Sequence, residues 1–152
     1  MRFGELLDMG GEAMSRWRIW LAVALPVAFL LTSCSSGPST EIKADMEEFE
    51  FSPVEWTVPE GEEITIELVN NGTLEHEWVI LQAGVTISDE AELPETEEEL
   101  LADFVYWEDE VEAGETKTVT FTAPPAGEYQ VICAIEGHFE SGMEGTLISE
   151  SA

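Results

Sequence analysis

Residues 63–70, EITIELVN, have an apolar side chain at every second position. Ile64, Ile66 and Leu68 alternate with charged or hydroxyl residues, and side chains two positions apart on a β-strand point to the same face of a sheet. This alternation predicts a strand with one face in a core and the other in water. Residues 116–122, TKTVTFT, repeat the pattern, so we expect a half-buried sheet.

Further runs of the same kind extend the prediction to an all-β domain. They are separated by PEG, NNG, AGE and PPAG, which combine residue types that favour turns. About eight short strands separated by such turn sequences are typical of a sandwich or a barrel. Beyond the two segments above, the expected strands lie at about 44–51, 56–58, 78–81, 104–107, 129–133 and 146–148.

One short helix is predicted within this pattern. In TEEELLADF, residues 96–104, Thr96 is followed three positions later by Glu99, which is a capping-box pattern. Leu100 and Phe104 are one helical turn apart. We expect the helix and its flanks, from about 84 to 103, to form an insertion between two strands.

Charge restricts the classes of partner. The chain has 152 residues, with 33 acidic residues against five Lys and Arg and a formal charge of -28. Beyond residue 18 the only basic residues are Lys43 and Lys117. Such a charge repels phosphate backbones and anionic lipid headgroups, so we expect neither nucleic-acid binding nor adsorption to a membrane through basic residues. A protein partner should have a basic surface.

The amino-terminal residues predict export. Arg16 and Arg18 precede an apolar stretch of 13 residues, 19–31. A stretch of that length is too short to span a bilayer as a helix but fits the core of a signal peptide. We therefore predict a signal peptide over 1–33. A true start at Met14 is an alternative, because the residues before it are acidic.

The residues after the apolar stretch predict a lipid anchor. LTSC, residues 31–34, resembles the lipobox of secreted lipoproteins, which implies that Cys34 becomes the first mature residue and is the site of lipid attachment. An ordinary secretory cleavage and an uncleaved anchor are the alternatives. Residues 34–41 have the composition of a flexible linker, and we expect the folded domain to cover 42–150.

The segment CAIEGHFESGM, residues 133–143, combines three side chains that bind soft metal ions. Cys133 ends an apolar strand, while His138 and Met143 lie in a glycine-containing loop. A thiolate and an imidazole with a weak thioether indicate copper rather than zinc, calcium or magnesium. His76, far away in the chain, is the only other histidine, and spacing alone does not show that it lies near Cys133.

Each of these residues also has a structural interpretation when taken singly. A lone histidine is usually structural, and a lone methionine or cysteine usually belongs to a core. A disulfide between Cys34 and Cys133 is a further alternative. A free thiol in an exported domain is, however, exposed to oxidation unless it is bonded or bound to a metal.

The residues resemble the blue-copper cupredoxin family, in particular its auracyanin-like and plastocyanin-like members. The resemblance rests on the spacing C-x4-H-x4-M, and more generally on FEFSP, VPEGEEITIELVNNG and EAGETKTVTFTAPPAGEYQVIC. It implies a Greek-key β-sandwich with one mononuclear type 1 copper site. The implied ligands are His76, Cys133 and His138 in the equatorial plane and Met143 as the axial ligand, with the carbonyl of Glu75 as a possible second axial contact.

The implied function is the transfer of single electrons between membrane-associated redox partners outside the cytoplasm. The partner would be a cytochrome or oxidase with a basic docking surface, and Phe139 is a candidate for an apolar docking patch. Storage or delivery of copper without electron transfer is the alternative. We expect no enzyme, because copper enzymes of related fold need more histidines than the two in this chain.

Two positions depart from the pattern of the family. Many members have asparagine after the first histidine ligand and Ser or Thr after the cysteine, and these side chains connect the two ligand loops. Glu77 and Ala134 occupy these positions here. Groups around the ligands set the reduction potential, so the sequence does not give its value.

Overall fold

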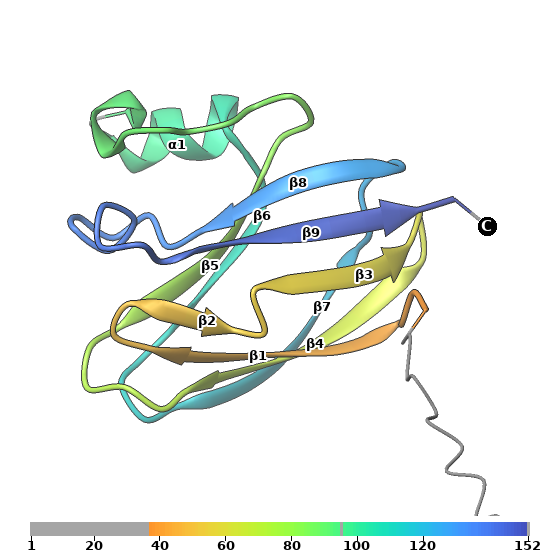
Figure 1. Ribbon diagram of the computed structural model, residues 1–152, viewed down its shortest axis with the longest axis horizontal. Helices are drawn as coiled ribbons and strands as arrows, with labels where there is room; N and C mark the ends of the chain where they lie inside the picture. The colour runs from red at the N-terminus through yellow and green to blue at the C-terminus, as the bar shows by residue number, and fades with distance from the viewer. Residues whose placement is uncertain (1–36, 95, 152) are drawn as a thin grey trace, which may run out of the picture. The chain divides into compact units, whose positions relative to one another are not determined.

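Two β-sheets form the domain in the computed structural model, which describes residues 37–94 and 96–151 (Figure 1). One sheet has the strand order β2-β1-β4-β7 and the other β3-β9-β8-β5-β6. The strands are β1 (Glu41–Glu47), β2 (Glu50–Ser52), β3 (Glu55–Pro59), β4 (Glu63–Asn70), β5 (His76–Leu81), β6 (Val105–Val111), β7 (Thr116–Thr122), β8 (Gly127–Ile132) and β9 (Glu144–Glu150). The predicted all-β sandwich is confirmed.

The described residues contain nine strands, one more than the sequence predicts. The expected strand at 44–51 is in fact two strands, β1 and β2, joined by a turn at Glu48 and Phe49. In this turn the Glu48 carboxylate accepts hydrogen bonds from the hydroxyl of Thr73 and the N–H of Leu74, in a neighbouring loop. Two strand pairs, β1 with β4 and β3 with β9, are parallel, which an alternating pattern cannot reveal.

The core lies between the sheets and is filled by the alternating side chains of the strands. Ile64, Ile66 and Leu68 of β4 are all fully buried, as their spacing predicts. Trp78 of β5 lies opposite them and packs edge to face on Trp56, with ring centroids 5.3 Å apart. Burial of large apolar side chains is the main stabilising contribution to such a domain.

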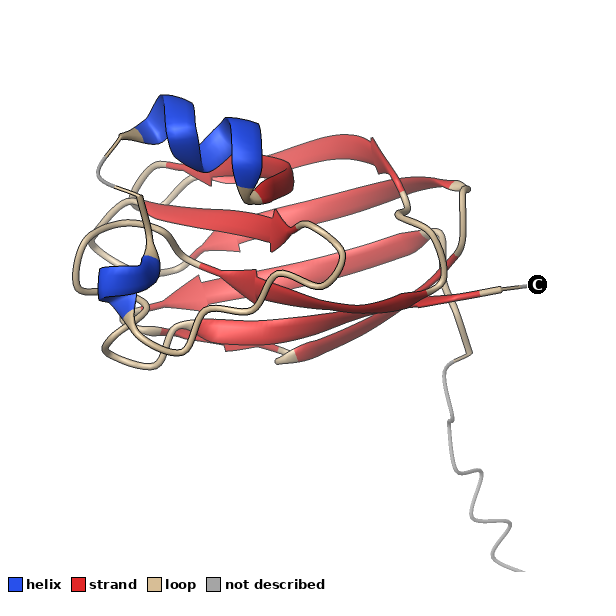
Figure 2. Ribbon diagram, turned by 90° about the horizontal axis from the view of Figure 1, so that it is seen from above, coloured by secondary structure: helices blue, strands red, loops and turns tan. Residues whose placement is uncertain are grey.

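The insertion between β5 and β6 contains a 3-10 turn, η1 (Glu90–Glu92), and the helix α1 (Glu97–Asp103). The predicted cap is confirmed, since the Thr96 hydroxyl accepts a hydrogen bond of 3.3 Å from the N–H of Glu99. The helix lies outside the two layers of strands, on the side of the five-stranded sheet (Figures 1 and 2). Among residues 37–94 and 96–151, no helix has the length and apolar character needed to span a bilayer.

The pairing of β5 with β8 brings two distant parts of the chain together. These strands are antiparallel, with Val79 opposite Ile132 and Ile80 opposite Val131. The first residue of β5 is His76, and Cys133 directly follows the end of β8. Antiparallel pairing therefore puts the start of β5 beside the end of β8, at the end of the sandwich shown at the left in Figure 1.

Candidate metal centre

His76 is positioned by a loop that two polar side chains hold in place. Asn70, buried at the end of β4, donates to the carbonyls of Leu74 (2.7 Å) and Val111 (2.9 Å) and accepts from the N–H of Gly72 (2.9 Å). Glu48 accepts from the N–H of Leu74 at 3.0 Å. These contacts fix the chain just before His76.

His138 is positioned by hydrogen bonds within its own loop. Its N–H donates to the carbonyl of Ile135 at 3.0 Å, and its carbonyl accepts from the N–H of Met143 at 3.1 Å. Gly137 has a φ of +83°, a conformation that residues with a Cβ rarely adopt. The ring of Phe49 packs edge to face against the imidazole of His138, with centroids 4.8 Å apart.

Three donor side chains converge beneath these loops. The candidate ligand atoms of His76, Cys133 and His138 all lie within 4.8 Å of one another. The Nδ1 of His138 is 3.2 Å from the Nδ1 of His76 and 3.3 Å from the Sγ of Cys133. All three residues are buried, and Nε2 of His76 has no hydrogen-bond partner. The fold therefore places His76 close to Cys133 and His138, which the spacing in the sequence alone did not show.

The ionisation states suit a metal ion. Burial lowers the pKa of both imidazoles, although the Glu48 carboxylate opposes this effect at His76 and the Glu90 and Glu48 carboxylates oppose it at His138. Burial also raises the pKa of the Cys133 thiol to about 11. Neutral imidazoles are ready to bind a cation, whereas the thiol must release its proton on binding.

The donor set, two imidazoles and one thiol in a dry site, fits copper better than a hard cation. Comparison with known proteins agrees. A family model described as a cupredoxin-like domain matches residues 20–148. The chain belongs to the cupredoxin family. In this family member, His76, Cys133 and His138 form the candidate site for a single type 1 copper ion.

The relatives of this cupredoxin include auracyanins. The chain is 32% identical to auracyanin-A of Chloroflexus aurantiacus over 84% of its own length and 93% of that protein. It is also 32% identical to a copper-resistant cuproprotein of Rubrivivax gelatinosus, over 64% of this chain and 58% of that protein.

Solved structures show the same fold. A reduced auracyanin from Roseiflexus castenholzii is 29% identical and superposes with a TM-score of 0.61, covering 75% of this chain and 99% of that one. Auracyanin A, described as a "blue" copper protein from Chloroflexus aurantiacus, has 32% identity and a TM-score of 0.58 over 75% of this chain and all of that one.

Met143 lies beside Cys133 in this cupredoxin. It is fully buried, and its carbonyl accepts a hydrogen bond of 3.1 Å from the N–H of Cys133. Cys133 is a free thiol among the described residues, and the disulfide considered from the sequence would need Cys34, which the structure does not describe. Cys34, the predicted site of lipid attachment, lies outside the described residues, as does the predicted signal peptide.

Glu77 connects the two ligand segments in place of the asparagine found in many cupredoxins. Its backbone N–H donates to the sulfur of Cys133 at 3.4 Å. Burial raises the pKa of its carboxyl to about 7, and nearby acidic side chains add to the rise, whereas the backbone N–H of Ala134 opposes it. The side chain therefore lies partly inside the protein and next to the residue that follows the cysteine.

Sequence reasoning overlooked the residues that hold the ligand loops. Asn70 lies in a recognised turn sequence, but nothing in the sequence marked its buried side chain as a tie between strands. Glu48 and Glu90 are far from the ligands in sequence, and no local sequence pattern marks either of them as a contact of the ligand loops. Phe139, a candidate for an apolar docking patch, is only 9% exposed and packs in a core cluster with residues of the insertion.

Proposed function

We propose that this cupredoxin is an electron carrier that transfers single electrons between redox partners outside the cytoplasm. One observation carries the proposal: a thiol and two imidazoles meet in a buried site built on paired strands. A rigid, dry site keeps its donor atoms in place when the charge of a bound ion changes. Little reorganisation then accompanies each electron, which is the property a carrier needs.

Four residues are assigned as ligands. His76, Cys133 and His138 would provide the three strong donors to bound copper, and Met143 would provide a weak thioether donor, following the preference of copper for this set. Bound copper supplies a one-electron couple between its cuprous and cupric states. The protein orients the imidazoles, excludes water through burial, and donates the N–H of Glu77 to the thiolate.

Storage or delivery of copper is the second candidate function. Proteins that hand over an ion benefit from accessible ligands, whereas His76 and Cys133 are fully buried and His138 is 7% exposed. An enzymatic function is disfavoured by the histidine count. Both histidines of the chain belong to this one site, so none is left for a second copper centre.

Charge supports the proposed partner, a cytochrome or oxidase with a basic surface. Glu136 and Glu140 are exposed on the loop around His138, and Glu144 is exposed at the start of β9. Opposite charge accelerates encounter and is screened by salt. We expect the electron-transfer rate with a basic cytochrome to fall as ionic strength rises, and a rate independent of salt would count against this partner.

Location and domain limits are part of the proposal. A signal peptide over 1–33, a lipid on Cys34 and a linker over 34–41 would keep the domain, 42–150, at the outer face of a membrane. Mass spectrometry of the membrane fraction from expressing cells tests this arrangement. A mature protein that begins at Cys34 and bears a lipid supports it, whereas an unmodified soluble form refutes the anchor.

Titration of the purified chain with cupric ion tests the copper function. We expect one ion per chain and an intense visible band from thiolate-to-copper charge transfer. Cys133→Ser should abolish the band. Met143→Leu should change the band and the reduction potential, whereas Met46→Leu, at another fully buried methionine, should change neither.

The same samples separate the two candidate functions. An electron carrier shows a reversible one-electron couple and rapid exchange with soluble reductants. A storage protein would bind copper without such a couple, and a colourless wild-type adduct would refute the type 1 site itself.

A further inference from the structure

The insertion between β5 and β6 packs against the loop that contains His138. A second core cluster joins Ile87, Leu93 and Leu100 of the insertion to Phe139, the residue that follows His138. Phe139 is buried by this contact. The insertion therefore holds the His138 loop on the carboxyl-terminal side of the histidine.

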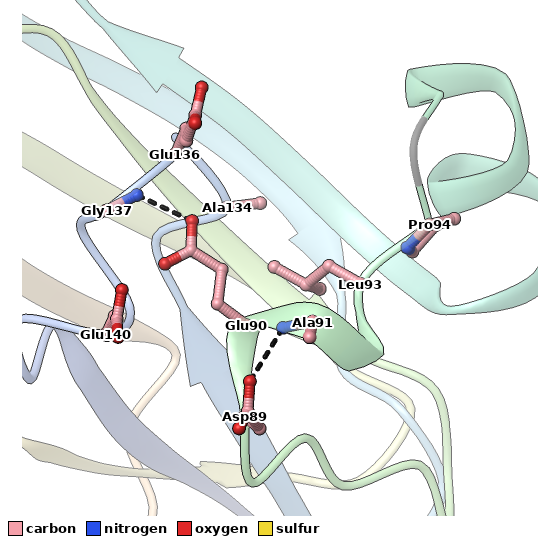
Figure 3. A pocket seen from close by; sticks show the side chains of 9 residues that line it. All are labelled: Asp89, Glu90, Ala91, Leu93, Pro94, Ala134, Glu136, Gly137 and Glu140. Atoms are coloured by element: carbon pink, nitrogen blue, oxygen red, sulfur yellow. Dashed lines mark hydrogen bonds between the residues drawn. The ribbon is translucent and has the colours of Figure 1, made fainter.

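A carboxylate of the insertion holds the same loop on the other side of the histidine. The N–H of Gly137 donates to Oε1 of Glu90 at 2.6 Å (Figure 3). Most other backbone groups of the loop form hydrogen bonds within the loop. The N–H of Ser141 donates to the carbonyl of Gly137, and the N–H of Gly142 donates to the carbonyl of Phe139. The bond to Glu90 is thus a tie from the loop to a separate part of the chain.

Glu90 is itself held in position. It is the first residue of η1, whose cap is the Asp89 side chain, which accepts from the N–H of Ala91 at 2.9 Å. The side-chain amide of Gln130, on β8, bonds to both the N–H and the carbonyl of Ile87, at 2.8 and 3.0 Å. These contacts fix the segment before Glu90 to the sheet, so its carboxylate has a defined place from which to bind the loop.

We propose that Glu90 is a positioning residue for the metal site: through Gly137 it clamps the loop so that His138 is held in its ligating position before copper arrives. This inference rests on the proposed copper function. A clamp of this kind reduces the ordering that the loop undergoes on binding, and it slows release of the ion, because moving the loop backbone at His138 away from the site would break the bond. The insertion then supports the copper site without contributing a ligand to it.

Amide hydrogen exchange on the copper-free full chain tests the clamp. In Glu90→Ala we expect the Gly137 N–H to exchange about tenfold faster or more, the factor expected for loss of a charge-assisted hydrogen bond. The N–H of Ile80 in β5 is the internal reference and should be unchanged. Glu90→Gln keeps an acceptor and should show a smaller increase, of about threefold. Glu98→Ala, at an exposed carboxylate of the same insertion, is the matched control and should behave as wild type.

Copper release to an excess of chelator tests the functional consequence. We expect release to be about tenfold faster in Glu90→Ala, largely rescued in Glu90→Gln, and unchanged in Glu98→Ala. Unchanged Gly137 exchange in Glu90→Ala would overturn the proposal, and so would equal increases at Gly137 and Ile80, which would indicate general destabilisation. If the wild-type chain forms no visible band, the copper function fails, but Gly137 exchange still decides whether Glu90 holds the loop.

Discussion

Replacing Asn70 by alanine should destabilise the domain by about 3 kcal/mol. The Asn70 side chain is 2% exposed and makes three hydrogen bonds, to the carbonyls of Leu74 and Val111 and to the N–H of Gly72. Each such bond contributes about 1 kcal/mol net, and the loss leaves buried partners unsatisfied. The three bonds together therefore give the expected decrease in the free energy of unfolding.

Urea denaturation of the copper-free chain at neutral pH measures this change. With a slope of about 1.5 kcal/mol/M, the midpoint should fall by about 2 M while the slope is unchanged. Asn71→Ala is a matched control, because the side chain of this neighbouring asparagine makes one exposed hydrogen bond, of 3.2 Å, to Asp45. Its cost should be below about 0.5 kcal/mol.

Asn70→Asp separates the donated bonds from the accepted one. The aspartate can still accept from Gly72, but its carboxylate faces the carbonyls of Leu74 and Val111 and cannot donate to them. We expect a loss at least as large as that of alanine, together with weaker copper binding because the chain before His76 loosens. If Asn70→Ala is as mild as Asn71→Ala, the reasoning that this side chain anchors the His76 loop is refuted.

Three further changes test other parts of the structure. Gly145→Ala should cost about 1–3 kcal/mol, because a Cβ there would lie 2.9 Å from the Trp56 ring and 2.8 Å from a backbone oxygen, whereas Gly127→Ala, with only ordinary contacts, should be milder in the same urea assay. Leu68→Ala should cost about 2–5 kcal/mol by leaving a cavity in the core, and a value below 1 kcal/mol would contradict its full burial. Hydrogen bonds from the loop before His76 lower the pKa of Glu48 to about 2 from its ordinary 4.5. The ionised carboxylate therefore stabilises the folded state above pH 4.5, and this stabilisation is lost as pH falls through about 2. Melting temperatures of wild type and Glu48→Gln should therefore differ most near neutral pH and converge in acid, and a gap that stays constant with pH would contradict this.

Much of the fold could be predicted because its causes are local. The alternation in 63–70 and 116–122 depends only on the geometry of a single strand, and the structure buries those side chains fully or in part. The Thr96 cap depends on contacts three residues apart and is confirmed. The break between β1 and β2 was not predicted, and Glu48 in that turn makes its contacts with a loop more than twenty residues away, which no local pattern contains.

The candidate site divides in the same way. The sequence by itself determined that a thiol, an imidazole and a thioether lie on one short loop after a strand, because neighbouring residues on a strand end and a tight loop cannot be far apart. Only the tertiary structure decided that His76 completes the set, because antiparallel pairing of β5 with β8 places it next to Cys133. The ties from Glu48, Asn70 and Glu90 to the ligand loops were likewise decided by the packing of distant segments. A hydrogen bond between residues far apart in the chain depends on where whole strands and loops come to lie, and no pattern local to either residue contains that information.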